Sequence, residues 1–226
     1  MKNRRIFLQK SVLAGAGLSA AGFGLASCRK ASSGIMETIH TRRSVRKYTS
    51  APVPEADLVQ ILNAARMAPT AGNQQPWKFV VIRNRETLNR MKQACMDNAI
   101  SRYKENKKWT EEEITTQRKK AEQYYTDVFS APVYVVVLVD MESERHYWND
   151  HDGPLAAGTL MLAARALGYG TVYYTGSIPG HVTKEVLQIP ERYKQVCITP
   201  VGVPAGWPKT PTKKPLDSFI MYEKIS

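Results

Sequence analysis

The feature that most constrains this chain is an almost unbroken apolar run, A-P-V-Y-V-V-V-L-V-D, at residues 131–140. Valine dominates the run, and its length suits one strand better than a helix. A strand without alternating polar positions has both faces covered, so the run predicts the central strand of a sheet that lies between helices. A chain of 226 residues can build one such domain around a well-buried core, or at most two small domains.

Periodicity and turn signals predict the remaining elements. Residues 52–69 repeat apolar positions at helical spacing and end at Pro69. Further helices are predicted over 35–41, 85–99, 111–127, 153–168 and 180–188, and further strands over 77–83, 171–175 and 196–203. The chain has no internal repeat. This mixed order, with about four strands, predicts an α+β layer fold.

The N-terminus has the pattern of an export signal. Residues 12–27 form an uncharged run rich in Ala and Gly behind a positively charged start. The run is shorter than the ~20 apolar residues that span a bilayer, so it predicts a signal peptide, with a buried apolar helix as the alternative. N-R-R-I-F-L-Q-K at 3–10 resembles the twin-arginine motif, and that resemblance implies export of an already folded, cofactor-loaded protein.

The signal at 1–27 is followed by a cysteine, in the run L-A-S-C at 25–28, which resembles a bacterial lipobox. By that resemblance Cys28 is lipidated and becomes the mature N-terminus. Residues 28–34 would then be a tether and 35–226 a single domain, anchored to a bacterial membrane on its extracytoplasmic or periplasmic face. Cys95 and Cys197 have apolar neighbours, which favours two buried free thiols, with a bridge as the alternative that an extracytoplasmic location would permit.

The distribution of charge argues against a nucleic-acid-binding surface, and the spacing of His and Asp argues against a metal site. The formal net charge is +12, but the cationic residues fall in separate clusters rather than one stripe. Separate clusters favour solvated helix faces and an anion pocket over a nucleic-acid surface. His146 and the run 150–152, Asp-His-Asp, match no common metal-ligand spacing. A helix start rich in Asp explains the run, so no metal site is predicted.

Residues 38–48, T-I-H-T-R-R-S-V-R-K-Y, concentrate three arginines, Arg42, Arg43 and Arg46, around Ser44. The guanidinium group is always charged, and its planar fork fits the oxygens of a phosphate. The serine adds a hydroxyl donor. The cluster predicts a phosphate pocket, with a solvated surface helix as the alternative.

Residues 68–77, A-P-T-A-G-N-Q-Q-P-W, form a second polar constellation. Two prolines and a glycine predict a turn between a helix and a strand. Thr70, Asn73, Gln74 and Gln75 offer hydroxyl and amide groups that suit the edge of a heterocycle. A structural loop with a packing Trp77 is the alternative.

The two constellations together resemble the nitroreductase family of flavoproteins. L-G-Y-G-T-V-Y-Y-T-G at 167–176 is similar to that family's late helix-strand step, and P-T-K-K-P-L at 211–216 to its C-terminal basic segment. The resemblance covers residues 35–222. It implies a nitroreductase-like α+β fold, with a central, mainly antiparallel sheet flanked by helices, and a homodimer that binds FMN at its interface.

The resemblance also assigns a role to each matching position. It implies that the phosphate and ribityl chain of FMN contact Arg42, Arg43, Ser44, Arg46, Lys213 and Lys214; that Thr70, Asn73 and Gln75 touch the flavin from the partner subunit; and that Tyr174, Thr175 and Gly176 lie beside the isoalloxazine. At the late basic pair the family more often has an arginine. No catalytic side chain is expected, because the flavin carries the chemistry.

The implied activity is a ping-pong, two-electron reduction of a small organic acceptor, such as a nitroaromatic or a quinone. NAD(P)H is the family's usual donor, but it is scarce outside the cytoplasm, so an exported protein favours a membrane quinol or a redox protein. Two alternatives stay open: a flavin-fragmenting or dehalogenating relative, and a non-catalytic FMN-binding lipoprotein. In residues 101–127, Trp109, Tyr124 or Tyr125 is a candidate cover for the substrate, with ordinary helix packing as the alternative.

Overall fold

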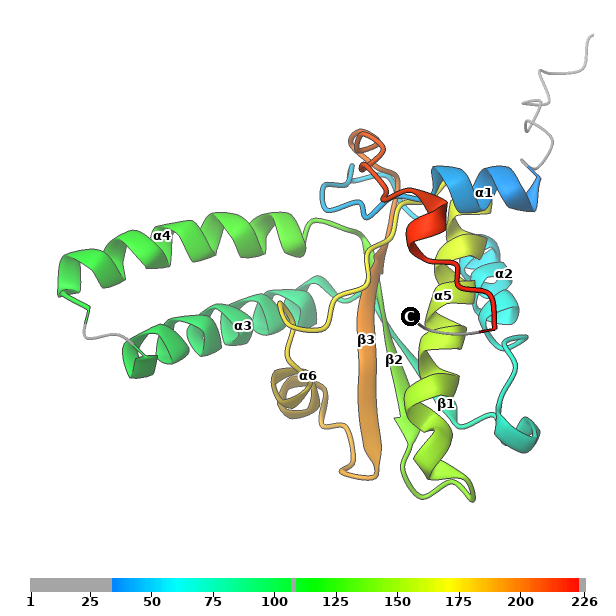
Figure 1. Ribbon diagram of the computed structural model, residues 1–226. Helices are drawn as coiled ribbons and strands as arrows, with labels where there is room; N and C mark the ends of the chain where they lie inside the picture. The colour runs from blue at the N-terminus through cyan, green and yellow to red at the C-terminus, as the bar shows by residue number, and fades with distance from the viewer. Residues whose placement is uncertain (1–33, 107–108, 224–226) are drawn as a thin grey trace, which may run out of the picture. The chain divides into compact units, whose positions relative to one another are not determined.

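The computed structural model describes residues 34–106 and 109–223 (Figure 1). The predicted signal peptide, Cys28 and all but the last residue of the predicted tether lie outside this part. The elements are α1 (Ile35–Thr41), α2 (Glu55–Ala65), η1 (Ala71–Asn73), β1 (Trp77–Ile82), α3 (Arg85–Asn106), α4 (Glu111–Val128), β2 (Val133–Asp140), η2 (His146–Trp148), α5 (Asn149–Ala166), α6 (Gly180–Leu187), β3 (Tyr193–Val201) and η3 (Leu216–Ser218).

The three strands form one antiparallel sheet in the order β1-β2-β3, so the apolar run at 131–140 is central, as predicted (Figure 1). Val133, Val135 and Val137 belong to the core cluster on one face of the sheet. Tyr134 and Val136 belong to the cluster on the other face. Because helices cover both faces, β2 needs no polar positions, which explains its unbroken hydrophobicity.

The helices are divided between the two faces. α2 and α5 lie on one side of the sheet and α3, α4 and α6 on the other (Figure 1). α5 approaches the sheet closely at Gly153, where a Cβ would lie 2.4 Å from Cγ2 of Val196 and 2.9 Å from Cγ1 of Val139. A side chain at residue 153 would therefore push the start of α5 off the strands.

The prediction of a strand over 171–175 is wrong. This segment meets β3 at one isolated bridge, between Tyr174 and Ile198, and a second bridge pairs Gly170 with Gly202 just beyond the segment and the strand. In that register Val172 lies opposite Pro200. Proline has no N–H to donate, so the ladder is interrupted at its centre. The described part of the sheet thus has three strands rather than the four expected.

α3 and α4 form a hairpin that extends away from the sheet on the side opposite α5 (Figure 1). Thr110 caps α4: its hydroxyl accepts from the N–H of Glu113 at 3.3 Å, and its own N–H donates to Oε2 of Glu113 at 2.8 Å. Tyr125 is buried in the core cluster at the base of the hairpin, whereas Tyr124 is 44% exposed. Ordinary packing therefore accounts for Tyr125, and Tyr124 keeps a surface position.

Two further expectations concern cysteines and membranes. Cys95 and Cys197 are both free and buried, as predicted, and they belong to core clusters on opposite faces of the sheet. Burial raises the pKa of each thiol to about 12. None of the helices in residues 34–106 and 109–223 combines the length and the hydropathy that a membrane crossing requires.

Candidate functional site

The arginine cluster and the C-terminal basic segment line the same cavity, which has a volume of about 630 Å³. Its lining residues are Ile39, His40, Arg42, Arg43, Ser44, Arg46, Pro208, Lys209, Thr210, Pro211 and Lys213. Five of these are Lys or Arg, and none is Asp or Glu. A cavity with several cations and no carboxylate in its lining is suited to a multiply charged anion such as a phosphate monoester.

Residues 44–48 hold the cluster in place because they are tied to the core. Ser44 forms a parallel bridge with Thr171, and the N–H of Val45 donates to the Thr171 carbonyl at 2.9 Å. Val45 is 1% exposed, and the hydroxyl of Tyr48 donates to its carbonyl at 2.6 Å. With Val45 and Tyr48 buried, the intervening Arg46 remains exposed beside the cavity.

The three arginines are not equivalent. Nη1 of Arg43 donates to the carbonyls of His40 at 2.7 Å and Arg42 at 2.8 Å, and its Nη2 donates to the Thr210 hydroxyl. Arg46 makes one long bond, 3.4 Å, to the Ser44 carbonyl. Within the described residues, the Arg42 side chain has no hydrogen bond or ion pair. Arg42 and Arg46 are therefore fully available to an anion, whereas Arg43 directs both terminal nitrogens to protein acceptors and contributes mainly its charge.

Only one lysine of the predicted late basic pair belongs to the cavity. Lys213 lines the cavity and Lys214 does not. Lys209 and Thr210 line it too, although the sequence reasoning assigned them no role. The cationic run at 209–214 is the local sequence signal for Lys209. Thr210 has no such signal, because a single threonine predicts no binding role.

The loop at 70–75 has a strained backbone. Gly72, Asn73 and Gln75 have φ values of 60°, 55° and 49°, in the left-handed region that favours glycine. A Cβ at residue 72 would lie 2.7 Å from Cζ of Arg145, so the arginine side chain lies directly against the loop. Two non-glycine residues in this conformation mark a loop whose shape is imposed by its surroundings, a pattern that concentrates at binding sites.

Asp152 is the main anchor of this loop, and the sequence reasoning missed it. Its carboxylate accepts from the N–H of Ala71 at 3.1 Å and from the side-chain amide of Gln74 at 2.8 Å. Gln74 in turn accepts from the N–H of Arg145 at 2.9 Å. The Asp-rich run at 150–152 lies in the first turn of α5, as predicted, but Asp152 also fixes a loop 81 residues away in sequence.

The predicted ligand-contacting residues of the loop remain on its surface. Asn73 and Gln75 are exposed, and the side-chain amide of Gln75 donates to the Asn73 carbonyl at 3.3 Å. The Thr70 hydroxyl accepts from the N–H of Gln75 at 3.2 Å. Gln74, in contrast, turns inward to Asp152. The loop therefore presents Asn73 and Gln75 outward and uses Gln74 as internal support.

The loop and the arginine cluster lie at opposite ends of α5. The loop is bound to Asp152 at the start of the helix, whereas Arg165 near its end donates to the Thr41 hydroxyl beside the cluster, at 3.1 Å. These two α5 residues are thirteen positions apart, which separates them by roughly 20 Å at about 1.5 Å per residue. The fold does not bring the two predicted groups together within one chain.

The predicted step at 174–176 lies near the base of the α3–α4 hairpin. Tyr174 is 4% exposed, and its hydroxyl has no hydrogen-bond partner among the described residues. Burial raises the pKa of Tyr174 to about 12. Thr175 and Gly176 are exposed, and the hydroxyl of the next residue, Ser177, lies 2.6 Å from that of Tyr124 on α4.

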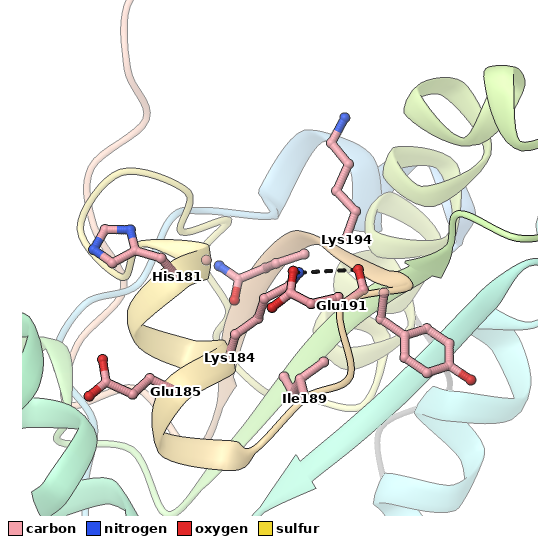
Figure 2. Close-up of a pocket in the computed structure, with 9 residues that line it drawn as sticks. His181, Lys184, Glu185, Ile189, Glu191 and Lys194 are labelled. Carbon is pink, nitrogen blue, oxygen red and sulfur yellow. Dashed lines mark hydrogen bonds and ion pairs between the residues drawn. The ribbon is translucent and has the colours of Figure 1, made fainter.

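A second cavity, of about 560 Å³, lies between α6 and the start of β3 (Figure 2). It contains none of the predicted site residues. Lys184 and Glu191 form an ion pair of 2.8 Å across it (Figure 2), so its charges are mixed and partly neutralised. As for metals, the part of the chain that the structure describes contains no group of three or more His, Cys, Asp or Glu placed to hold an ion.

Comparison with known proteins identifies relatives along most of the chain. Residues 39–203 match the family described as the Nitroreductase family. A protein from Methanothermobacter thermautotrophicus, provisionally named an NADH dehydrogenase/NAD(P)H nitroreductase, is 32% identical over 78% of this chain and 80% of its own length. The iodotyrosine deiodinase of Nematostella vectensis is 26% identical over 86% of this chain and 77% of its own.

Solved structures share the fold. An iodotyrosine deiodinase bound to FMN and 3-iodo-L-tyrosine superposes with a TM-score of 0.69 at 22% identity, over 85% of this chain and all of the other. A provisionally assigned nitroreductase from Desulfovibrio desulfuricans, in complex with FMN, gives 0.66 at 22% identity, over 86% and 99%. At these identities the likeness supports the architecture, including the antiparallel sheet between helices.

Proposed function

The chain belongs to the nitroreductase family, and from that premise we propose that it is an exported, FMN-dependent oxidoreductase that reduces a small organic acceptor by two electrons. One observation supports the proposal above the others. The cavity formed by residues 39–46 and 208–213 gathers five cations without a carboxylate, and Arg42 and Arg46 are not committed to protein acceptors. This donor set fits the phosphate of FMN.

In this proposal the residues of the cavity hold and orient the cofactor. Arg42, Arg46 and Lys213 neutralise the phosphate, and Ser44 adds a hydroxyl donor. Tyr174, Thr175 and Gly176 would lie beside the isoalloxazine, as the family resemblance implies; Thr175 and Gly176 are exposed to a ligand, whereas Tyr174 is buried behind them. FMN, when bound, supplies the redox chemistry by taking two electrons from a donor and giving them, with two protons, to the acceptor.

We further propose that the active unit is a homodimer. Thr70, Asn73 and Gln75 would complete the flavin site of the partner subunit rather than that of their own chain. The separation of the loop from the arginine cluster along α5 supports this arrangement, because one chain does not gather both groups around one cavity. The strained backbone of the loop is consistent with a binding role.

The location and the donor are proposals from the sequence. A twin-arginine signal over 1–27 and lipidation at Cys28 would place the folded, cofactor-loaded domain 35–226 on the outer side of a bacterial membrane. After removal of Lys2, Arg4, Arg5 and Lys10 with the signal, the mature chain would keep 28 lysines and arginines (32 − 4) against 20 acids, which suits an anionic membrane surface. A quinol or a redox protein is the proposed donor there, with NAD(P)H as the cytoplasmic alternative.

A second candidate is reductive dehalogenation of a halogenated phenol. Iodotyrosine deiodinases recur among the relatives, including those of Nematostella vectensis and Danio rerio at 26% and 28% identity. In this reading the acceptor loses halide as it takes two electrons and a proton. Tyr124 is the proposed cover of the acceptor, because its hydroxyl already reaches Ser177 beside the predicted flavin step.

Flavin binding tests the cofactor assignment. The mature protein is expected to show flavin absorption bands and to bind FMN more tightly than riboflavin, which lacks the phosphate. Arg42→Gln and Arg46→Gln should each weaken FMN binding by about 10- to 100-fold, the effect of one charged hydrogen bond, and leave riboflavin binding unchanged. Arg118→Gln on α4 is the matched control. Equal affinities for the two flavins in the wild-type protein would refute the phosphate site.

Reoxidation kinetics tests the activity. Anaerobically photoreduced protein should be reoxidised by a nitroaromatic or a quinone faster than free reduced FMN at the same concentration. Release of iodide from 3-iodo-L-tyrosine, without comparable reaction of the nitroaromatic, would favour dehalogenation. No acceleration with any of these acceptors would support the non-catalytic FMN-binding alternative instead.

A further inference from the structure

The C-terminal segment that forms one wall of the cationic cavity has little burial to hold it. Every residue from 205 to 223 is exposed. Lys209 and Lys213 nevertheless lie opposite the arginine cluster in the same cavity. The N–H of Ala205 donates to the Lys47 carbonyl at 3.0 Å and ties the start of the segment to the domain. Beyond that bond, side-chain contacts position the segment, since it buries little apolar surface.

Arg165, near the end of α5, contacts the C-terminal segment on one side and the start of the arginine cluster on the other. Its guanidinium carbon lies 4.1 Å from the ring centroid of Trp207, a stacking distance for a cation on an aromatic face. Its Nε donates to the Thr41 hydroxyl at 3.1 Å. Arg165 thereby joins the residue just before Arg42 to the residue two positions before Lys209.

Arg43 provides the second link between the same two segments. It donates to the Thr210 hydroxyl and, through its other terminal nitrogen, to the carbonyls of His40 and Arg42. Among the described residues, two polar or cation–aromatic side-chain contacts join residues 206–214 to the rest of the domain: Trp207 with Arg165, and Thr210 with Arg43. Two arginines thus fix the wall that carries the lysines.

We propose that Arg165 is a positioning residue of the anion cavity, acting as a clamp through Trp207 and Thr41. The inference rests on the proposed function, because it assigns the clamp to the phosphate of FMN. Arg165 does not line the cavity. Its effect on the ligand is indirect: the clamp keeps Lys209 and Lys213 at the distance where they share the phosphate with Arg42 and Arg46.

Comparison of FMN with riboflavin separates this role from a general effect on the fold. Arg165→Gln removes the charge and the planar fork. It should lower the affinity for FMN by about tenfold and leave the affinity for riboflavin and the melting temperature of the apoprotein unchanged. Binding is measured by quenching of flavin fluorescence, which does not require turnover.

Matched variants sharpen the test. Trp207→Ala should reproduce the loss of FMN affinity, and Trp207→Phe, which keeps an aromatic face, should largely restore it. Arg165→Gln combined with Trp207→Ala should lose no more than Arg165→Gln alone, because the arginine change already removes the contact with Trp207. Arg192→Gln is the control, since Arg192 also lies over a ring, 5.1 Å from that of Tyr193, but outside the cavity lining.

The outcomes distinguish the clamp from the function on which it depends. If wild-type protein prefers FMN and Arg165→Gln keeps that preference, the clamp is wrong and the phosphate site stands. The clamp is equally wrong if the variant weakens FMN and riboflavin alike, because a fold effect then explains the loss. If wild-type protein binds both flavins equally, the proposed phosphate site is wrong, and the clamp falls with it.

Discussion

The carboxylate of Asp152 accepts a hydrogen bond from the side-chain amide of Gln74 at 2.8 Å, and it accepts a second from the N–H of Ala71 at 3.1 Å. The contact joins the first turn of α5 to a loop whose backbone is held in the left-handed region at Gly72, Asn73 and Gln75. One buried acid therefore supports the shape of a candidate ligand-binding loop.

Asp152→Asn should destabilise this loop. The new amide would place a donor against donors, and Gln74 cannot turn over without losing the bond that it accepts from the Arg145 N–H. The expected loss is about 1–2 kcal/mol in the free energy of unfolding, with faster hydrogen exchange at Ala71 and Arg145. Asp150→Asn, which affects an exposed ion pair with Lys194, is the control and should leave exchange in the loop unchanged.

Loss of the hydroxyl should change the free energy of unfolding differently at two buried tyrosines. The Tyr134 hydroxyl donates to the Val128 carbonyl at 2.6 Å and accepts from the Ala131 N–H at 3.2 Å, so Tyr134→Phe should cost about 1–2 kcal/mol. The Tyr174 hydroxyl is buried without a partner in the described part of the chain, so Tyr174→Phe should be neutral or stabilising by up to about 1 kcal/mol. Urea unfolding of the apoprotein measures both, and an equal loss in the two variants would contradict the difference.

Acid stability should depend on Asp140. Its hydrogen-bonded ion pair with Arg192 lowers the pKa of the Asp140 carboxyl in the folded protein. A lowered folded pKa gives stability that is present above the unfolded pKa and is lost as pH falls below about 4. Melting temperatures of wild type and Asp140→Asn should therefore differ at neutral pH and converge in acid. Glu142→Gln, at an exposed partner of the same arginine, should show a weaker effect; a constant gap at every pH would contradict the assignment.

Cys95 and Cys197 should be unreactive in the native protein. Both are fully buried, and burial raises the pKa of each to about 12, so almost no thiolate is present at neutral pH. A thiol reagent added to a Cys28→Ser variant should label neither residue before unfolding and both afterwards. Labelling of either cysteine in the native protein at the rate of an exposed thiol, or a disulfide found by mass spectrometry, would contradict the structure.

Local sequence patterns predicted most of the helices and strands, because the preference for a helix or a strand is largely a local property of the chain. The apolar run at 131–140 became β2, and helical periodicity placed α2, α4 and α6 within a few residues of their ends. The strand expected at 171–175 failed for a non-local reason, since its β-forming residues face Pro200 across a register that the sequence does not reveal. α3 also runs further than its predicted end at residue 99, because the hairpin with α4 supports it.

The sequence by itself determined that three arginines, a polar loop and a late basic segment exist, and their motifs were sufficient to suggest a flavin nucleotide. Only the tertiary structure decided how they divide the work. It committed Arg43 to protein acceptors while leaving Arg42 unpaired in the described region, and it turned Gln74 inward onto Asp152. It also set the loop and the cluster at opposite ends of α5. Which hydrogen-bond partners a side chain finds depends on contacts between segments far apart in the chain, and no local pattern carries that information.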